Sequence, residues 1–470
     1  MKSRMLHKVL MLVVCCLLVA GCTTSKSKTE EQANIKSSIK VMFFDQGYFF
    51  QQYGDLFTVN FPNIDIQVVS TQSLYNQGGG TDYNKAMQEL IDKEQPDVLM
   101  LNTDTYEKYA ADGKVQELDS LINRDKYNIE NIYPALIELL KEKGAGKLYG
   151  LSPSFSSNAV YYNADLFKKY GVEIPHDGIT WQEIFDLAKR FPTEGDEDTR
   201  IYGYAAQYNM SLNSMVQTIA NTQGLTDINL ETLKVTVNTE SWKKVYQLAL
   251  DAMDSKIIYN PKPSDGAIMM EDYFKQQLFI MGRAAITTSG SYMLQSMQQA
   301  KTAIPEYKPF ELGIVAGPVD SAEPDATRDI YFNEIFAINA KSPNVDAAWE
   351  FIKFINGEDY AKVKSKTMNN GLLSRMGYST EFDGISLDVF YKLKPKLDQK
   401  YYTRAEKIPT NFYEQYNPIV EREIGLVQEK KKSLDDALKT IEEEGQVVLD
   451  KAIKEKEENK TKDATETTAE

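Results

Sequence analysis

Apolar and polar residues alternate in short, regular patterns along the first hundred residues of the chain. Segments 39–44 and 97–101 are largely apolar, and segment 64–68 places an apolar residue at every second position. Each pattern predicts a β-strand. Four apolar residues between the second and third strands recur at the spacing of one helical face: Tyr83, Met87, Leu90 and Ile91. Strands that alternate with helices in this way predict a mostly parallel α/β sheet.

Three later segments carry clear helix signals. Segment 180–183 is a capping box followed by an apolar stripe, and segment 342–343 begins a second helix that ends at Gly357. Ser433 begins a long amphipathic helix, and the charged, threonine-rich segment 456–470 is expected to be a disordered tail. The three tryptophans lie on apolar helix faces and are expected in the core: Trp181, Trp242 and Trp349.

The N-terminus carries an export signal. Residues 1–21 begin with basic residues and continue in an apolar stretch of 12, shorter than the roughly 20 that span a bilayer. The stretch ends in Leu18-Val19-Ala20-Gly21-Cys22, which resembles a lipobox, with Val19 where Leu is more usual. That resemblance implies cleavage before Cys22 and diacylation of its thiol, and two acyl chains suffice for stable anchoring. An ordinary signal peptide with an incidental Cys22 is the alternative.

Residues 22–38 are rich in Ser, Thr, Lys and Glu and lack periodic apolar positions. This composition predicts a flexible tether between the lipid and the folded part of the chain.

Composition narrows the classes of function. Without residues 1–21 the chain keeps 50 Lys and Arg against 68 Asp and Glu, a net charge of −18, which argues against nucleic-acid binding. Cys22 is the only cysteine outside the signal, so no disulfide is expected within the chain. His176 is the only remaining histidine and lies in a turn-like segment, which disfavours His-based zinc sites and catalytic triads. No cofactor or metal is expected, and the length predicts two domains.

Polar side chains follow two of the predicted strands directly. Asp45, Gln46 and Tyr48 come after the first strand, and Asp104 comes after the third. Because ligands bind at the carboxyl ends of strands in open α/β sheets, these four residues are candidates for a ligand site. Helix capping is the alternative for Asp45 and for Asp104.

Several motifs resemble those of the family 1 extracellular solute-binding proteins, the receptors of carbohydrate-uptake ABC transporters. They include the strand 97–101, the Tyr-Tyr-Asn and Leu-Phe motifs of segment 160–167, and the helix start at 180–183. Further similar segments are 108–119, 148–152, 279–292, 313–318, 335–343 and 347–354. Their order and spacing are specific, and together they cover roughly residues 40–455.

The resemblance implies an α/β fold of two lobes, like the type II periplasmic binding proteins, joined by three hinge crossings. A cleft that closes on a hinge can surround a small polar ligand with hydrogen bonds from both sides. The second and third crossings are expected at 279–292 and 335–343. The expected lobes are 39–149 with 287–333 for lobe 1, and 150–286 with 334–455 for lobe 2.

In the regions where the family binds ligands, the resemblance implies aromatic and amide side chains. Tyr292 stands where many members carry Trp and is the leading candidate to stack on a sugar ring, with core packing as the alternative. Gln207, Tyr208 and Asn209 occupy the region in which maltose-binding relatives place an acid and an aromatic residue. Because Gln207 replaces the acid, maltose specificity is not carried over.

Four further candidates come from the crossings and the segment after them. Asn333 and Glu334 are expected to bond sugar hydroxyls at the third crossing, and Phe155 lies between two crossing elements. Arg375 is expected either to reach the cleft or to pair with an acid on the surface. Tyr161 and Tyr162 are neighbours on the 160–167 strand, and one of them is expected in the core. Tyr162 is the favoured one.

The function expected from these features is that of a lipid-anchored, monomeric receptor on the extracytoplasmic face of the cell membrane. It is expected to capture a sugar or oligosaccharide and to deliver it to the permease subunits of an ABC importer. The alternatives are a lipoprotein that presents its ligand to a sensor, and a receptor for a peptide or polyamine.

An enzyme is not expected. Segment 241–244 fits S-x-x-K without the companion motifs of a penicillin-binding site, and G-x-S-x-G, H-E-x-x-H and Walker motifs are absent from the sequence. An acidic chain always offers carboxylate pairs, so a glycosidase is the enzymatic alternative.

Overall fold

The computed structural model describes residues 37–75, 83–196, 199–261, 269–368, 371–396, 404, 407–409 and 411–467. The predicted signal peptide, Cys22 and most of the predicted tether lie outside the described residues. The chain divides into two compact units, one ending at Glu94 and one beginning at Gln95. Among the described helices, none combines the length and apolar character that a membrane crossing requires.

The first unit is built on two parallel strands, β1 (Ser37–Phe43) and β2 (Ile64–Ser70), which lie where the apolar pattern predicts them. Aromatic rings form much of its interior, because Phe43 lies 5.5 Å from Phe49 and 5.8 Å from Tyr53 between ring centroids. Its helices are α3 (Gln46–Phe49), the π-helix η1 (Phe50–Gly54), α4 (Asp55–Asn60), α5 (Gln72–Tyr75) and α6 (Tyr83–Glu94). The last confirms the predicted helix between the second and third strands.

Within the second unit, three strands belong to a first sheet. Strand β14 (Ile335–Ile338) runs antiparallel between β3 (Val98–Leu101) and β4 (Gly150–Leu151). Helices α7, α9 and α16 pack against these strands. The helices of this region are α7 (Thr103–Ala111), α8 (Asp119–Asp125), α9 (Pro134–Lys143), α16 (Val345–Ile355) and α17 (Glu358–Lys364).

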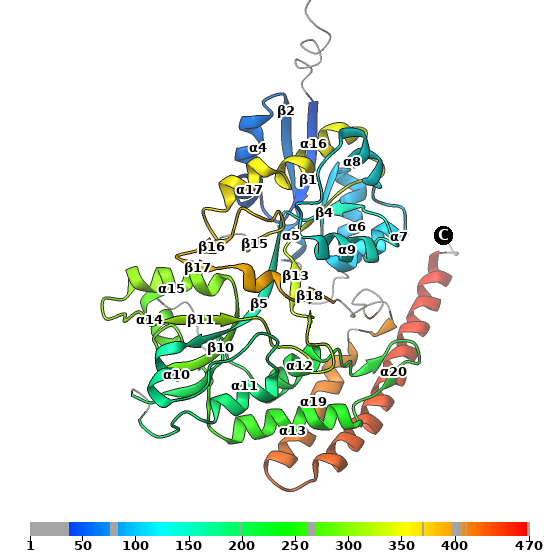
Figure 1. The fold of residues 1–470 in the computed structure, drawn as a ribbon. Coiled ribbons are helices and arrows are strands. Elements are labelled where there is room, and N and C mark those ends of the chain that lie inside the picture. The colour runs from blue at the N-terminus through cyan, green and yellow to red at the C-terminus, as the bar shows by residue number, and fades with distance from the viewer. Residues whose placement is uncertain are drawn as a thin grey trace, which may run out of the picture. The chain divides into compact units, whose positions relative to one another are not determined.

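A second sheet forms around the long strand β5 (Ser154–Asn163), with the order β11-β5-β10-β6-β9. Strand β10 runs antiparallel to β5 and parallel to β6. The other strands are β6 (Tyr202–Ala205), β9 (Ile258–Tyr259), β10 (Ala284–Gly290) and β11 (Leu312–Val315). The neighbouring helices are α10 (Ala164–Tyr170), α11 (Trp181–Ala188), α12 (Leu212–Thr222), α13 (Glu240–Asp254), α14 (Met270–Gln276) and α15 (Tyr292–Ala303) (Figure 1).

The predicted capping box starts α11, since the Thr180 side chain accepts a hydrogen bond from the backbone N–H of Glu183, and the Glu183 carboxylate accepts one from the backbone N–H of Thr180. Trp181, Trp242 and Trp349 are all buried, as predicted. One member of the tyrosine pair lies in the core as predicted, but the choice between them is wrong: Tyr161 is fully buried and the favoured Tyr162 is only half-buried. Tyr162 lies across Gly313 on the neighbouring strand, where any side chain would collide with its ring.

The start of β5 is flanked by two short antiparallel strands, β13 (Ile330–Phe332) and β15 (Leu372–Leu373). Both strands belong to the second sheet, and the chain passes between the two sheets from β4 to β5 and from β13 to β14. The remaining short elements are β7 (Ile228–Asn229), β8 (Lys234–Val235), β12 (Ala326–Thr327), β16 (Glu381–Phe382), β17 (Ile385–Ser386), the 3₁₀-helix η2 (Asp388–Tyr391) and β18 (Lys394–Pro395).

Strand pairing reverses part of the predicted division into lobes. Segment 287–333, expected in lobe 1, supplies β10 and β11 to the sheet of β5. Segment 335–338, expected in lobe 2, supplies β14 to the sheet of β3 and β4. The chain therefore passes from the second sheet to the first at 332–335, because β13 pairs with β5 and β14 pairs with β3 and β4.

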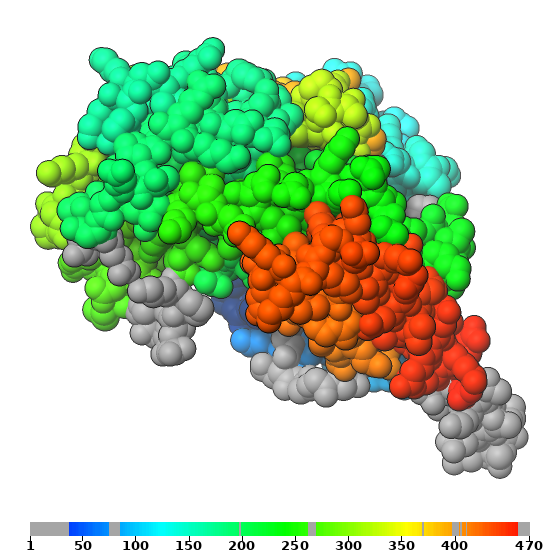
Figure 2. All heavy atoms as spheres, turned by 90° about the horizontal axis from the view of Figure 1, so that it is seen from below, coloured from blue at the N-terminus to red at the C-terminus, as the bar shows by residue number. Residues whose placement is uncertain are grey.

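The C-terminal helices α19 (Asn411–Gln428) and α20 (Leu434–Thr467) pack against each other, and α20 also contacts α13 and β8. Figure 2 shows the orange and red helices lying against the green segment that contains α13. Helix α20 continues to Thr467, beyond the predicted start of a disordered tail at 456. Pairs of opposite charge one helical turn apart support this extension, such as Lys454 with Glu458 at 3.8 Å.

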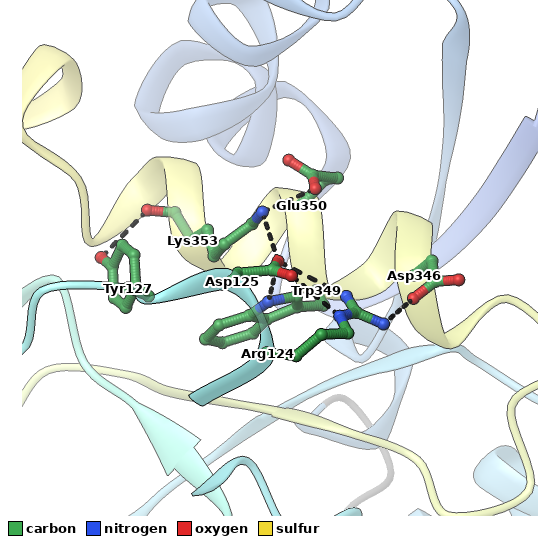
Figure 3. A network of polar contacts seen from close by, with 7 residues as sticks. All are labelled: Arg124, Asp125, Tyr127, Asp346, Trp349, Glu350 and Lys353. Atoms are coloured by element: carbon green, nitrogen blue, oxygen red, sulfur yellow. Dashed lines mark hydrogen bonds and ion pairs between the residues drawn. The ribbon is translucent and has the colours of Figure 1, made fainter. Parts of the chain in front are cut away.

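A closed polar network joins the end of α8 to α16 (Figure 3). Asp125 accepts hydrogen bonds from Lys353 Nζ at 2.8 Å, from Trp349 Nε1 at 2.9 Å and from Arg124 Nε at 2.8 Å. The hydrogen bonds from Arg124 and Lys353 hold the pKa of Asp125 well below its usual range. The bonds of Asp125 to Trp349 and Lys353, together with the ion pair of Arg124 and Asp346, hold the end of α8 against α16.

Candidate functional site

Tyr292 stands at the junction between β10 and α15, at the carboxyl end of the second sheet. Its ring lies over the bare backbone of Gly290, where a Cβ atom would come within 2.8 Å of Cε1 of the ring. The side chain is 41% exposed, and partial burial raises the pKa of its hydroxyl to about 12. Tyr292 is therefore a protonated, half-exposed ring held in a fixed position.

Gln207 and Tyr208 follow β6, whose carboxyl end lies beside that of β10 because the two strands are parallel. The Tyr292 hydroxyl donates a hydrogen bond to Gln207 Oε1. The backbone carbonyl of Gln207 accepts a hydrogen bond from Gln277 Nε2 at 3.1 Å, which fixes the loop. The side chain of Tyr208 is 63% exposed, so the end of β6 presents both an amide and an open aromatic ring.

A third tyrosine joins this cluster. Tyr273 of α14 lies within electrostatic range of Tyr208 and Tyr292, and burial raises the pKa of its hydroxyl. The structure thus brings Gln207, Tyr208 and Tyr292 together as predicted candidates and adds Tyr273, which the sequence analysis missed. No local motif marks Tyr273, since it lies on a separate short helix.

Asn209 contributes to the same loop by a structural contact. Its Nδ2 donates to the carbonyl of Pro261 at 2.9 Å, and the next backbone amide, of Met210, donates to Asn260 Oδ1 at 2.7 Å. These bonds attach the loop after β6 to the loop after β9.

Asn333 lies beside β5, on a face of that strand lined with polar residues. Its Nδ2 donates to Ser154 Oγ at 3.0 Å, and its Oδ1 accepts from Ser156 Oγ at 2.7 Å. Gly371 has φ 76°, and a Cβ atom there would lie 2.8 Å from Asn333 Nδ2, so only glycine fits. Glu334, the next residue, is half-buried where β13 leads into β14.

The polar face of β5 connects Asn333 with Tyr292. Ser154, Ser156 and Asn158 occupy alternate positions and therefore share one side of the strand. Asn158 pairs with Gly290, and a Cβ atom on Gly290 would lie 3.3 Å from Asn158 Oδ1. We name the face formed by Asn333, Ser156, Asn158, Gly290 and Tyr292 the polar strip. The alternation of polar residues at 154, 156 and 158 was a signal that the sequence analysis did not use.

Two predicted candidates lie in the packed interior of the second unit. Phe155 is fully buried, with its ring centroid 5.7 Å from that of Tyr133 and 5.3 Å from that of Tyr391. Arg375 is 4% exposed, and its guanidinium donates to the carbonyls of Asn356 at 2.7 Å and Asn128 at 3.0 Å. Neither of the two positions expected for Arg375, the cleft or a surface ion pair, describes this arrangement.

In the first unit, Asp45 caps α3 by accepting a hydrogen bond from the backbone of Tyr48 at 2.9 Å. This is the capping alternative named for Asp45. Gln46 and Tyr48 are exposed on the first turn of that helix, and the Tyr48 ring lies 5.8 Å from that of Phe43. The first unit therefore presents an amide and an aromatic ring directly after β1.

Asp104 lies in the first turn of α7, which is capped by Asn102 rather than by Asp104. Partial burial, with the negative charge of Glu107 nearby, raises the pKa of Asp104 to about 6, and Lys143 offsets part of this effect. Asp104 is thus a half-buried carboxyl at the carboxyl end of β3, with some protonated form near neutral pH.

The second unit's cluster and polar strip combine aromatic rings with hydroxyls and amides. Ring faces bury the apolar side of a ligand, while amides and hydroxyls form hydrogen bonds with its polar groups. No group of three His, Cys, Asp or Glu side chains within the described residues is placed to hold a metal ion. The chemistry suits recognition of a polyhydroxylated molecule.

Comparison with known proteins places this arrangement in a family. The family model for bacterial extracellular solute-binding proteins matches residues 44–362. Among curated relatives, the chain is 26% identical over 193 residues to the sn-glycerol-3-phosphate-binding periplasmic protein UgpB of Agrobacterium fabrum, covering 38% of this chain and 40% of that one. It is 24% identical over 290 residues to a binding protein of Brucella abortus, covering 59% and 62%. The chain thus spans less than two thirds of these relatives.

Solved structures share the fold over most of the chain. The substrate-binding protein Lmo0181 of Listeria monocytogenes, in complex with cycloalternan, is 21% identical with a TM-score of 0.57, covering 87% of this chain and 98% of that one. A family 1 extracellular solute-binding protein of Alicyclobacillus acidocaldarius is 15% identical with a TM-score of 0.59, covering 88% and 99%. Maltose-bound MalE3 of T. maritima is 17% identical with a TM-score of 0.54, covering 88% and 100%.

The fold is therefore that of the two-lobed, periplasmic-binding-protein-like α/β receptors. The chain belongs to the bacterial extracellular solute-binding proteins. This family is a class of receptors that bind solutes outside the cytoplasm and do not catalyse reactions on them.

Proposed function

We propose that this protein is a lipid-anchored receptor that captures a neutral sugar or oligosaccharide by closing its two lobes and delivers it to an ABC importer. The observation that carries the proposal is the cluster of Tyr292, Tyr208, Tyr273 and Gln207, which offers exposed ring faces beside a fixed amide. Asp45, Gln46, Tyr48, Asp104, Asn333 and Glu334 are the further residues proposed to contact ligand. Arg375 and Phe155 are not included, because both are packed in the interior.

The polarity of the cluster favours a neutral ligand. Gln207, Tyr208, Tyr273 and Tyr292 carry no charge at neutral pH, and burial holds the hydroxyl of Tyr292 protonated. A phosphate ester, such as the ligand in the name of the UgpB relatives, is bound best by Arg or Lys side chains in bidentate or point contacts. Arg375, the only cation among the predicted site residues, donates hydrogen bonds to backbone carbonyls.

A thermal-shift screen of the purified chain tests the proposal. The panel holds mono- and oligosaccharides, sn-glycerol 3-phosphate, amino acids, peptides and polyamines. A ligand that binds only the native state raises the melting temperature by mass action. The proposal predicts that a neutral sugar gives the largest shift and that the sugar is recovered unchanged. A shift with only peptides, polyamines or the phosphate ester contradicts the sugar assignment, and steady turnover contradicts a binding role.

The anchor is tested separately, because Cys22 lies outside the described residues. Cys22→Ala removes the thiol that the lipobox resemblance assigns to diacylation, so the protein is expected in the medium or as an unprocessed precursor. Cell fractionation with an antibody measures this. A correctly cut Cys22→Ala chain that stays in the membrane fraction contradicts the lipid anchor. Cys15→Ala, inside the predicted signal, serves as the control and is expected to leave anchoring unchanged.

A further inference from the structure

A polar cavity of about 520 Å³ lies in the second unit beside the polar strip. The residues that matter to its chemistry are Asn158 of β5, Gln217, Thr218 and Asn221 of α12, Asp329, and Tyr331 of β13. Its volume falls within the range of about 300–1,000 Å³ typical of small-molecule sites. A space of this size and polarity fits a ligand group rather than a single structural water.

The cavity and the Tyr292 cluster share a wall. Asn158 lines the cavity, and its Oδ1 and the Tyr292 ring both stand over Gly290, within 3.3 and 2.8 Å of the point where a Cβ atom would be. Tyr331 pairs with Ser156 across the strands, so its side chain projects from the same face as those of Ser156 and Asn158. A ligand that covers Tyr292 therefore meets the cavity directly at Asn158.

The walls of the cavity match the surface of a sugar. Tyr331 is 48% exposed and offers a ring face, as Tyr292 does at the other end of the polar strip. Gln217 and Asn221 lie one helical turn apart on α12 and so present two amides on one side. Asp329 Oδ2 accepts a hydrogen bond from Asn158 Nδ2 at 2.5 Å, and the Tyr331 hydroxyl also bonds this carboxyl.

Two carboxyl groups lie at the cavity, and they have different partners. Asp227 is buried and accepts a hydrogen bond from Arg404 Nη2 at 2.5 Å, so this pair is neutralised. Asp329 is held by Asn158 and Tyr331 and has oxygen lone pairs left to accept from hydroxyls. The arrangement disfavours an anion and offers Asp329 as an acceptor for the hydroxyl groups of a ligand.

We propose that this cavity is a second sugar subsite, which makes the preferred ligand an oligosaccharide of at least two units rather than a monosaccharide. One sugar unit stacks on Tyr292 and the next enters the cavity. There Asn158 and Asp329 form hydrogen bonds with its hydroxyls, and Tyr331 covers one of its faces. This inference rests on the proposed sugar-binding function and assigns Asn158, Asp329 and Tyr331 as specificity-determining residues.

Calorimetry with free sugars of one to four units, in the gluco-, galacto-, manno- and xylo-series, tests the subsite. The parent is expected to bind the two-unit or longer member of its preferred series about tenfold or more tightly than the one-unit member. Tyr331→Ala is expected to reduce this preference to about threefold or less, while affinity for the one-unit sugar stays within about twofold. Gln217→Trp, which fills the exposed side of the cavity, is expected to have the same effect. The control is Tyr378→Ala, at a tyrosine that bonds Glu358 instead.

The outcomes separate the subsite from the proposed function. Sugar binding with no preference for length, or a length preference that both Tyr331→Ala and Gln217→Trp retain, overturns the subsite and leaves the function in place. Binding to none of the sugars overturns both. Melting curves of each variant without ligand distinguish a lost contact from a lost fold, and Gln217→Trp changes an exposed helix position that the fold does not depend on.

Discussion

Around Asp125, three donors converge on one carboxylate, whereas around Tyr292 three tyrosines and an amide meet at the ends of two strands and leave ring surface exposed. In the first region the partners are Arg124, Trp349 and Lys353, and the hydrogen bonds from Trp349 and Lys353 join α16 to the end of α8 (Figure 3). In the second, Tyr292 and Tyr208 keep 41% and 63% of their surface in solvent. A polar cluster that satisfies itself stabilises the fold, and one that leaves aromatic and amide groups open is available to bind.

Two carboxyl groups of the second unit, Asp125 in the first region and Asp104 on α7 outside both regions, also differ in their pKa. Hydrogen bonds from cations hold the pKa of Asp125 below its usual range, while partial burial raises that of Asp104 to about 6. A lowered pKa indicates a carboxylate whose negative charge is already stabilised by hydrogen bonds and cations within the fold. A raised pKa marks one whose environment leaves the charge less well compensated, as expected of a residue that meets ligand.

The largest effect is expected in the closed region. Trp349 is fully buried and donates to Asp125, so Trp349→Ala should lower the free energy of unfolding by about 3–5 kcal/mol. Chemical denaturation measures this change. Affinity for the sugar identified by screening should stay the same in the fraction that is folded. A loss of less than about 1 kcal/mol of unfolding free energy, or a change in the sugar affinity of the folded protein, would contradict the proposed difference between the two regions.

A smaller effect is expected for Asp125→Asn, which removes the charge that Arg124 and Lys353 share. The cost should be about 1–3 kcal/mol of unfolding free energy at pH 7. Because the folded pKa is lower than the unfolded one, the stabilisation is present above about pH 4 and is lost as the pH falls below that value. The difference between parent and variant should therefore shrink in acid. A difference that is constant from pH 7 to pH 3 contradicts the assignment.

The smallest effect is expected for Asp104→Asn, and its sign is opposite. Because the folded pKa is raised to about 6, the parent is favoured at low pH and loses this contribution as the pH rises through the window from about 4 to 6. The variant does not titrate there, so its stability relative to the parent should increase from pH 4 to pH 7. Melting temperatures without ligand across this range measure the trend. A variant that becomes relatively less stable with rising pH contradicts it.

Local patterns predicted the elements well, because each depends on residues near one another in sequence. Periodicity predicted the strands at 39–44, 64–68 and 97–101 and the buried tryptophans, and a local motif predicted the capping box at Thr180. The placement of β10 and β11 could not be predicted in this way, since both strands form hydrogen bonds with β5, more than a hundred residues away. The same pattern of apolar residues fits a strand of either sheet.

The candidate site shows the same limit. Tyr292, Gln207 and Tyr208 follow strand ends, and the parallel pairing of β6 and β10 brings them together. Arg375 and Phe155 also follow or lie between such elements, but contacts from distant segments draw both into the interior. Tyr273 could not be predicted, because only tertiary packing carries its short helix to the other two tyrosines.

The most direct test measures sugar affinity and apo stability together for Tyr292→Ala, with Tyr292→Phe and Tyr378→Ala beside it. Loss of the stacking ring should cost about 1–3 kcal/mol of binding free energy in Tyr292→Ala, while its melting temperature without ligand stays close to that of the parent. Tyr292→Phe keeps the ring and loses the hydroxyl with its bond to Gln207, so it should bind almost as well, and Tyr378→Ala should match the parent. If Tyr292→Ala binds the sugar as tightly as the parent, or loses affinity only because the fold itself melts, then Tyr292 is a packing residue and the proposed site is wrong.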